Sequence, residues 1–123
     1  MSAEQPRILV VDDSAALREN LQECLELEGY HVTVATGGPD ALERLATGPL
    51  PAVILLDLVM PGMDGRELVT RIRANPRLAG VRIVMSSGHT APRTREGVAF
   101  DAFLPKPFGV DELLAVVRGE LVR

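Results

Sequence analysis

Carboxylates, hydroxyls and one ammonium group stand at the ends of four apolar runs in this sequence. They are Asp12 and Asp13 after residues 7–11, Asp57 near the end of 52–58, Ser86 and Ser87 at the end of 81–86, and Lys106 after 101–105. Any one of these residues alone has an ordinary use in capping a helix or a turn. Their joint occurrence at four run ends indicates instead one shared site.

The acidic residues indicate a hard divalent cation. Adjacent carboxylates repel each other, so Asp12 and Asp13 call for a positive charge nearby. Three carboxylates suit Mg²⁺, which takes few protein ligands and completes its shell with water and phosphate. Zinc is disfavoured, because Cys24 lies within a helical pattern and the only histidines are His31 and His89. Without metal, the acidic pair is expected to destabilise the protein slightly.

A carboxylate beside Mg²⁺ and a lysine can also attack phosphorus. Aspartate forms an acyl phosphate in aspartyl-phosphate enzymes. The metal would neutralise the incoming phosphoryl group, while Lys106 and a serine hydroxyl would hold its remaining oxygens. The residue types therefore predict phosphoryl transfer to an aspartate.

The order of elements predicts how these groups are brought together. Five strands are expected, at residues 7–11, 31–35, 52–58, 81–86 and 101–105, alternating with helical patterns, and residues 60–65 are expected to form a turn. Strict alternation implies one doubly wound parallel sheet with helices on both faces, within a single domain of residues 1–123. Ligands of such sheets bind beyond the carboxyl ends of the strands, where the strand order reverses.

Composition narrows the functional classes. The chain has 123 residues, a net charge of −4, three Phe, one Tyr and no Trp. This charge and the scarcity of aromatic residues argue against nucleic-acid binding. A single cysteine fits a reducing compartment, no apolar run approaches the roughly 20 residues of a membrane span, and no signal peptide pattern is present. We therefore expect a cytoplasmic protein without a membrane partner.

Four motifs resemble the response-regulator receiver domain of two-component signalling, the CheY-like superfamily. They are VVDDS (10–14), LLDLVMPGMDG (55–65), MSSG (85–88) and LPKPF (104–108), and the similarity covers essentially the whole chain. The resemblance implies a flavodoxin-like (βα)5 fold with strand order 2-1-3-4-5. It implies a sensor histidine kinase or phosphotransfer protein as donor, a downstream protein partner, and a monomer or weak phosphorylation-dependent dimer. The chain would be a stand-alone receiver or part of a longer regulator or hybrid kinase.

The resemblance also assigns roles at the site. Asp57 matches the phosphoacceptor, and Asp12 and Asp13 match the acid pair that binds Mg²⁺. The backbone carbonyl of Val59 would be a further metal ligand. Lys106 matches the lysine that contacts the phosphoryl group.

Further positions match the parts that respond to phosphorylation. Ser87, the second of the two serines, matches the switch hydroxyl, because the small residue Gly88 follows it. Phe103 matches the aromatic switch, although an ordinary core phenylalanine is the alternative. The bond between Lys106 and Pro107 is expected to be cis, as in the family.

Two positions would set the lifetime of the phosphoryl group. Val59 offers no hydrogen bond to an attacking water, which favours slow hydrolysis, whereas His89 could either orient or shield water. We expect a lifetime of minutes or longer. Only 18 residues separate Ser87 from Lys106, fewer than is usual in the family, so the fourth helix is expected to be short or irregular.

Two other classes remain as alternatives. A Mg²⁺-dependent phosphohydrolase with an aspartyl nucleophile usually carries a second acid two residues after the nucleophile, where Val59 stands. A nucleotide-binding domain would need a glycine-rich turn after the first strand, and DDSAA has none. A signalling module that catalyses only its own phosphorylation and dephosphorylation is the preferred interpretation.

Overall fold

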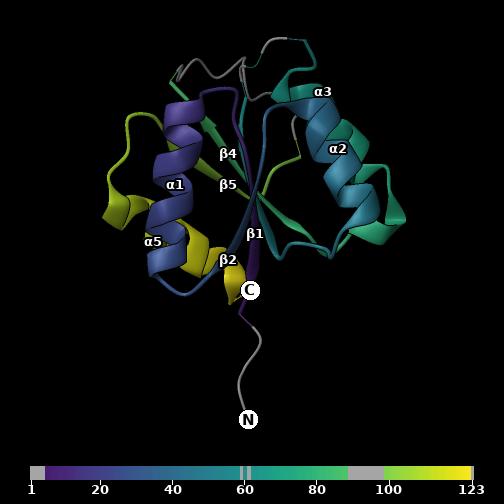
Figure 1. Ribbon diagram of the computed structural model, residues 1–123. Helices are drawn as coiled ribbons and strands as arrows, with labels where there is room; N and C mark the ends of the chain where they lie inside the picture. Colours follow the sequence, from purple (N-terminus) through teal and green to yellow (C-terminus); the bar gives the residue numbers. More distant parts are fainter. Residues whose placement is uncertain (1–4, 59, 61, 89–98, 123) are drawn as a thin grey trace.

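A five-stranded parallel sheet forms the centre of the protein (Figure 1). The computed structural model describes residues 5–58, 60, 62–88 and 99–122. The strands are β1 (Arg7–Val11), β2 (His31–Ala35), β3 (Val53–Asp57), β4 (Arg82–Ser87) and β5 (Ala102–Pro105). Their order is β2-β1-β3-β4-β5, with every neighbouring pair parallel, which confirms the predicted topology.

Helices cover both faces of the sheet, as the alternation of elements predicted. Helices α1 (Ala15–Leu27) and α5 (Val110–Leu121) lie on one face, and α2 (Gly38–Thr47) and α3 (Gly65–Arg73) lie on the other, followed by a short 3₁₀ turn η1 (Pro76–Leu78) (Figure 1). The stretch expected to hold a short fourth helix includes residues 89–98, which lie outside the described residues. No described helix has the length and apolarity to cross a membrane.

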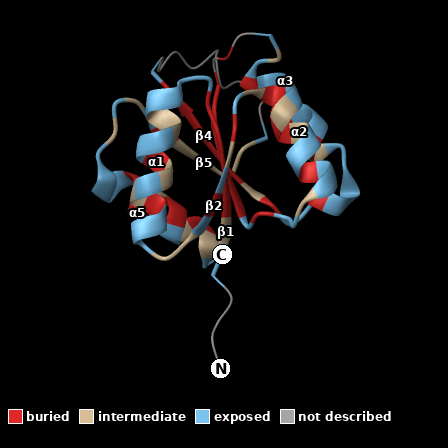
Figure 2. Cartoon of the chain, viewed as in Figure 1, coloured by how far each residue is buried: buried red, intermediate tan, exposed pale blue. Residues whose placement is uncertain are grey.

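The inner strands β1, β3 and β4 are largely apolar because both of their faces are covered (Figure 2). Side chains alternate between the faces with a period of two. In β1, Leu9 and Val11 pack in the cluster beneath α2 and α3, while Ile8 and Val10 pack in the cluster beneath α1 and α5. Each of these four residues is at most 2 % exposed. The burial of both faces holds the strand ends at one rigid edge.

Two helices begin directly after this edge. Ser14 accepts a hydrogen bond from Leu17 N (3.3 Å) at the start of α1, and Asp64 accepts one from Glu67 N (3.0 Å) at the start of α3. These side chains satisfy backbone N–H groups that have no partner within the helix. The loops after β1 and β3 are therefore fixed at both of their ends.

A network of charged residues holds β5 in place at the amino ends of the strands, away from the edge with the acidic residues. Asp101 Oδ2 accepts hydrogen bonds from Ile83 N (2.7 Å) and Arg73 Nη2 (2.6 Å). Arg82 Nη2 lies 3.5 Å from Asp101 Oδ1 and 3.2 Å from Glu120 Oε1 on α5. The start of β5 is thus tied to α3, β4 and α5, which positions the lysine that follows β5.

Candidate functional site

Three carboxylates converge at the carboxyl ends of β1 and β3. One oxygen from each of Asp12, Asp13 and Asp57 lies within 4.8 Å of the others. Asp12 and Asp57 are buried, with 3 % and 9 % exposure, whereas Asp13 is exposed. The two strands are neighbours in the sheet, so residues 45 positions apart in the chain meet at this edge (57 minus 12). The structure therefore brings together the acidic residues that the strand ends indicated.

Lys106 lies between two of these carboxylates. Its Nζ is 3.2 Å from Asp12 Oδ2 and 3.4 Å from Asp57 Oδ2. Lys106 directly follows β5, which is the edge strand opposite β2, and its ammonium extends from there to the carboxylates. It supplies positive charge to the acidic group without a metal ion. It therefore offsets part of the repulsion that the sequence suggested for the metal-free pair, whose net effect on stability stays a prediction.

The backbone and side chain of Asp12 are held by several further hydrogen bonds. Its Oδ1 accepts from Ser14 N (2.9 Å), its backbone N–H donates to Ala35 O (3.2 Å), and its carbonyl accepts from Arg18 Nη1 (2.7 Å). These contacts hold Asp12 against the start of α1. The role of Arg18 had no signal in the sequence, because an arginine early in a helix is ordinarily a solvent-exposed residue.

The different settings of the two neighbouring aspartates lead to a testable difference. We expect Asp12→Ala to lower the free energy of unfolding by about 1–3 kcal/mol without metal, because Ser14 N–H and Lys106 each lose a charged partner. Asp13→Ala should change it by less than about 0.5 kcal/mol, since the side chain is exposed. Urea denaturation in a chelating buffer measures both values.

Mg²⁺ titration of the same two variants tests the common role of the aspartates. Both variants should bind Mg²⁺ at least ten times more weakly than the unaltered protein, a drop of about 1.4 kcal/mol or more in binding free energy. Unchanged Mg²⁺ affinity in Asp13→Ala would contradict its assignment as a ligand. Equal losses of stability in the two variants would contradict the structural distinction between them.

The residues after β4 and β5 lie beside the lysine. Ser87 is fully buried, and its carbonyl accepts a hydrogen bond from Lys106 N (2.9 Å). A Cβ placed on Gly88 would lie 4.0 Å from Lys106 Cβ, so the glycine adjoins the lysine stem. The bond between Lys106 and Pro107 is cis, as predicted. Ser87 and Gly88 therefore stand at the same edge as the acidic cluster.

Phe103 lies in β5, two residues before the strand ends. It is partly buried and packs against the core beneath α2 and α3. Its ring centroid is 6.1 Å from that of Phe100, with the planes tilted by 52°. The side chain thus lies near the surface of the core. Val59 and His89 lie outside the described residues.

The resemblance to the receiver family assigned the switch hydroxyl to Ser87 and gave Ser86 no role. The structure places Ser86 in a different environment from Ser87. It precedes Ser87 in β4, and the alternation of side chains directs it toward the opposite face of the sheet. Its neighbour two positions back, Val84, packs in the cluster beneath α1 and α5. Ser86 is 3 % exposed. The alternation along β4 was the signal that could have separated the two serines.

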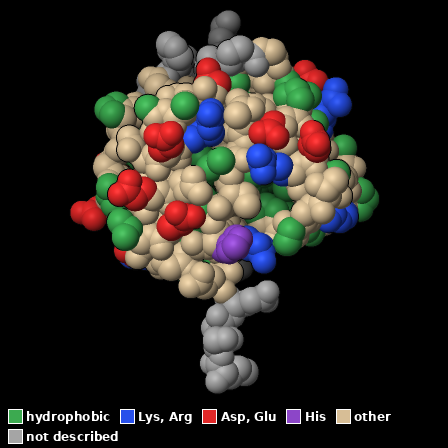
Figure 3. Space-filling view, in the orientation of Figure 1, with side chains coloured by type: hydrophobic (Ala, Val, Ile, Leu, Met, Phe, Trp, Pro, Cys, Tyr) green, Lys and Arg blue, Asp and Glu red, His purple; other side chains and the backbone are tan. Residues whose placement is uncertain are grey.

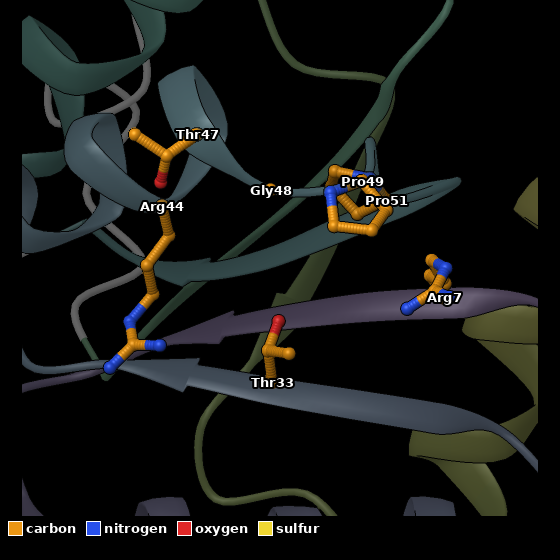
Figure 4. A pocket seen from close by; sticks show the side chains of 7 residues that line it. All are labelled: Arg7, Thr33, Arg44, Thr47, Gly48, Pro49 and Pro51. Carbon is orange, nitrogen blue, oxygen red and sulfur yellow. The ribbon is translucent and has the colours of Figure 1, made fainter.

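A pocket lies away from the acidic cluster. It has a volume of about 150 Å³ and adjoins the start of β1, the middle of β2 and the end of α2. Figure 4 shows Arg7 and Arg44 at opposite ends of it, with Thr33 between them. Arg44 also pairs with Asp40 at 3.4 Å. The two guanidinium groups do not converge on one point.

The charges on the surface in view are mixed. Both acidic and basic side chains lie on the face that carries α1 and α2, with acidic ones prevailing over α1 (Figure 3). Exposed pairs such as Arg71 with Glu67 at 3.0 Å belong to single helices. Interspersed charges of this kind suit solubility and form no broad basic surface on this face.

The fold and the edge residues together define a class of protein. A doubly wound sheet of order β2-β1-β3-β4-β5 is the fold of CheY-like α/β domains, and in this chain an acidic cluster and a lysine lie at its strand ends. Residues 8–118 match the family described as the response regulator receiver domain. The chain belongs to this family, whose members act in two-component signalling.

Individual relatives agree with this assignment. The response regulator MprA of Mycobacterium ulcerans (strain Agy99) is 37 % identical over 118 residues, which are 95 % of this chain and 50 % of the relative. The chain thus spans about half the length of the curated relatives it matches.

Solved structures share the fold. The chemotaxis protein CheY4 of Vibrio cholerae matches with 30 % identity and a TM-score of 0.89, over 96 % of this chain and all of the other. A putative response regulator from Chloroflexus aurantiacus J-10-fl matches with 31 % identity and a TM-score of 0.89, over 98 % and 100 %. The signal receiver domain of a histidine kinase from Syntrophus aciditrophicus matches with 28 % identity and a TM-score of 0.89, over 95 % and 90 %.

Proposed function

We propose that this chain accepts a phosphoryl group on Asp57 with the help of Mg²⁺ and then changes its affinity for a downstream protein. The donor would be a sensor histidine kinase or a phosphotransfer protein in the cytoplasm. The observation that supports this best is the position of Lys106 Nζ, which lies 3.4 Å from Asp57 and 3.2 Å from Asp12. A nucleophilic carboxylate, a second buried carboxylate and a fixed ammonium group are the parts that phosphoryl transfer to aspartate requires.

The transfer itself uses an oxygen of Asp57. This carboxylate oxygen forms a bond to phosphorus while the bond from phosphorus to the donor atom breaks, and the donor keeps the electron pair. Lys106 lies within reach of an oxygen of the transferred group and neutralises part of its charge. The side chain of Asp57 is only 11 % exposed, and this burial limits the access of competing water.

The donor set at the site fits Mg²⁺. Asp12, Asp13 and Asp57 offer carboxylate oxygens within 4.8 Å of one another, two of them from buried residues. Hard oxygen ligands in this number are typical of Mg²⁺, which retains several waters. When bound, the ion neutralises the carboxylates and the phosphoryl oxygens. The backbone carbonyl of Val59 would complete the protein ligands.

The response to phosphorylation would pass through the residues beside the lysine. Ser87 would turn its hydroxyl toward the new phosphoryl group, next to the small Gly88, and Phe103 would move further into the core. Val59 and His89 would set how fast the acyl phosphate hydrolyses, with a lifetime of minutes or longer. The protein would act as a signalling module, as a monomer or as a weak phosphorylation-dependent dimer.

Acetyl phosphate provides a direct test. Incubation of the protein with acetyl phosphate and Mg²⁺ should add the mass of one phosphoryl group in intact-mass spectrometry, and a chelator should prevent it. Decay of the adduct within seconds would contradict the slow hydrolysis expected from Val59. Continuous hydrolysis of a generic phosphoester without an adduct would identify a phosphohydrolase instead. Absence of both adduct and hydrolysis would contradict the proposed function.

A further inference from the structure

The hydroxyl of Ser86 is buried and lacks a protein partner. Within the part of the chain that the structure describes, Ser86 Oγ has no hydrogen bond, although the residue is only 3 % exposed. A buried hydroxyl without a partner is costly, and such groups in folded proteins are usually satisfied by an ordered water. Ser86 lies at the end of β4, next to Asp57 of β3 in the sheet register. A buried hydroxyl without a hydrogen-bond partner at this position requires a structural explanation.

A small cavity adjoins this hydroxyl. It has a volume of about 10 Å³ and lies beneath the acidic cluster, on the side of the sheet covered by α1 and α5. Its polar lining comes from Ser86, Asp12, Asp57 and Lys106, and Leu21 and Phe108 are among the apolar residues around it. A space of this size is at the lower limit for one water molecule, and a buried water needs two to four polar partners. The lining offers that number.

Lys106 has a further N–H donor for such a water. A protonated lysine carries three N–H donors. Lys106 Nζ donates a hydrogen bond to Asp12 Oδ2 at 3.2 Å and forms an ion pair with Asp57 Oδ2 at 3.4 Å. Lys106 also lines the cavity, so a remaining N–H donor can serve an acceptor there. A serine hydroxyl both donates and accepts, so it can hold a water that the ammonium also contacts.

We propose that one buried water bridges Ser86 Oγ and Lys106 Nζ, and that Ser86 is thereby a positioning residue for the lysine. The water satisfies the serine hydroxyl and limits the directions in which the ammonium can turn. The kinetic consequence rests on the proposed function, because it concerns the lysine's contact with a phosphoryl group on Asp57. The water itself does not depend on that function.

A crystal structure tests the water directly. At a resolution that shows ordered solvent, the unaltered protein should contain one water within hydrogen-bond distance of both Ser86 Oγ and Lys106 Nζ. Ser86→Ala should lose this water, since one of its partners is gone. A cavity without solvent density, with Ser86 Oγ bonded to a main-chain carbonyl, would overturn the proposal. This experiment decides the matter even if the protein forms no phosphoryl adduct.

The rate of adduct formation tests the positioning role. With acetyl phosphate and Mg²⁺, Ser86→Ala should react about 2- to 10-fold more slowly, which corresponds to the loss of one ordinary hydrogen bond. Its affinity for Mg²⁺ should stay unchanged, because the three carboxylates remain. Thr70→Ala, which removes an exposed hydroxyl bonded to Arg66 O, is the matched control and should react at the normal rate.

A merely structural serine would give a different pattern. In that case Ser86→Ala would shift the melting temperature while the rate of adduct formation stayed normal, and the proposal would be overturned. Failure of the unaltered protein to form any adduct would contradict the proposed function instead. The two ideas therefore fail by separate observations.

Discussion

Asp57→Asn is expected to abolish the phosphoryl adduct completely while leaving the fold intact. The amide lacks the anionic oxygen that attacks phosphorus, and no neighbouring group can replace it from the same position. The asparagine side chain has nearly the same shape, and its oxygen can still accept from Lys106. The variant also relieves repulsion with Asp12 and Asp13, which offsets the lost attraction to the lysine. We expect the free energy of unfolding to change by no more than about 1 kcal/mol.

Intact-mass spectrometry with acetyl phosphate and urea denaturation together measure this result. Asp64→Asn is a suitable control, because Asp64 is an exposed aspartate at the start of α3 that lies outside the carboxylate cluster. The control should form the adduct normally. Persistence of a full adduct in Asp57→Asn would place the acceptor elsewhere, with Asp13 the first residue to examine, and would contradict the assignment of Asp57.

Gly65→Ala is expected to destabilise the protein by about 3 kcal/mol, at the upper end of the cost of overpacking. A Cβ at this position would lie 2.7 Å from both Asp57 O and Leu58 Cα, and 3.0 Å from Leu56 Cδ1. The first two are backbone atoms, which cannot rotate out of the way. Gly65 N also donates to Leu58 O (2.8 Å), so α3 begins in direct contact with the end of β3. An added methyl group must push the helix away from the strand.

The same substitution elsewhere provides the control. Gly119 lies in α5, and a Cβ there would meet nothing within 4 Å. Gly119→Ala should stabilise the protein by up to about 1 kcal/mol, because alanine favours the helix. Urea denaturation of the two variants should therefore give changes of opposite sign. A Gly65→Ala variant as stable as the unaltered protein would show that α3 can move at little cost, contrary to this reasoning.

Much of the fold could be predicted because its signals are local. Uninterrupted apolar runs indicated strands covered on both faces, and their alternation with helical patterns indicated a parallel sheet. The bounds of β1 and β2 were predicted without error, whereas β3, β4 and β5 differ from prediction by one residue at one or both ends. The ends of strands depend on pairing with neighbours, which a single sequence does not display.

The contents of the site could be predicted for a related reason. Parallel strands place their carboxyl ends at one edge, so the residue types after each run indicate which groups meet there. Asp12, Asp13, Asp57 and Lys106 were found in this way, and the structure brings them together.

The sequence by itself determined the class of fold and the chemical groups at the edge of the sheet, because both follow from local pattern and strand direction. Only the tertiary structure decided how those groups interact. Lys106 is separated from Asp12 by 94 positions, yet it lies between Asp12 and Asp57 and offsets a repulsion that the sequence alone suggested. The contact of Gly65 with β3 and the buried hydroxyl of Ser86 likewise depend on how elements pack across the sheet, which local sequence does not encode.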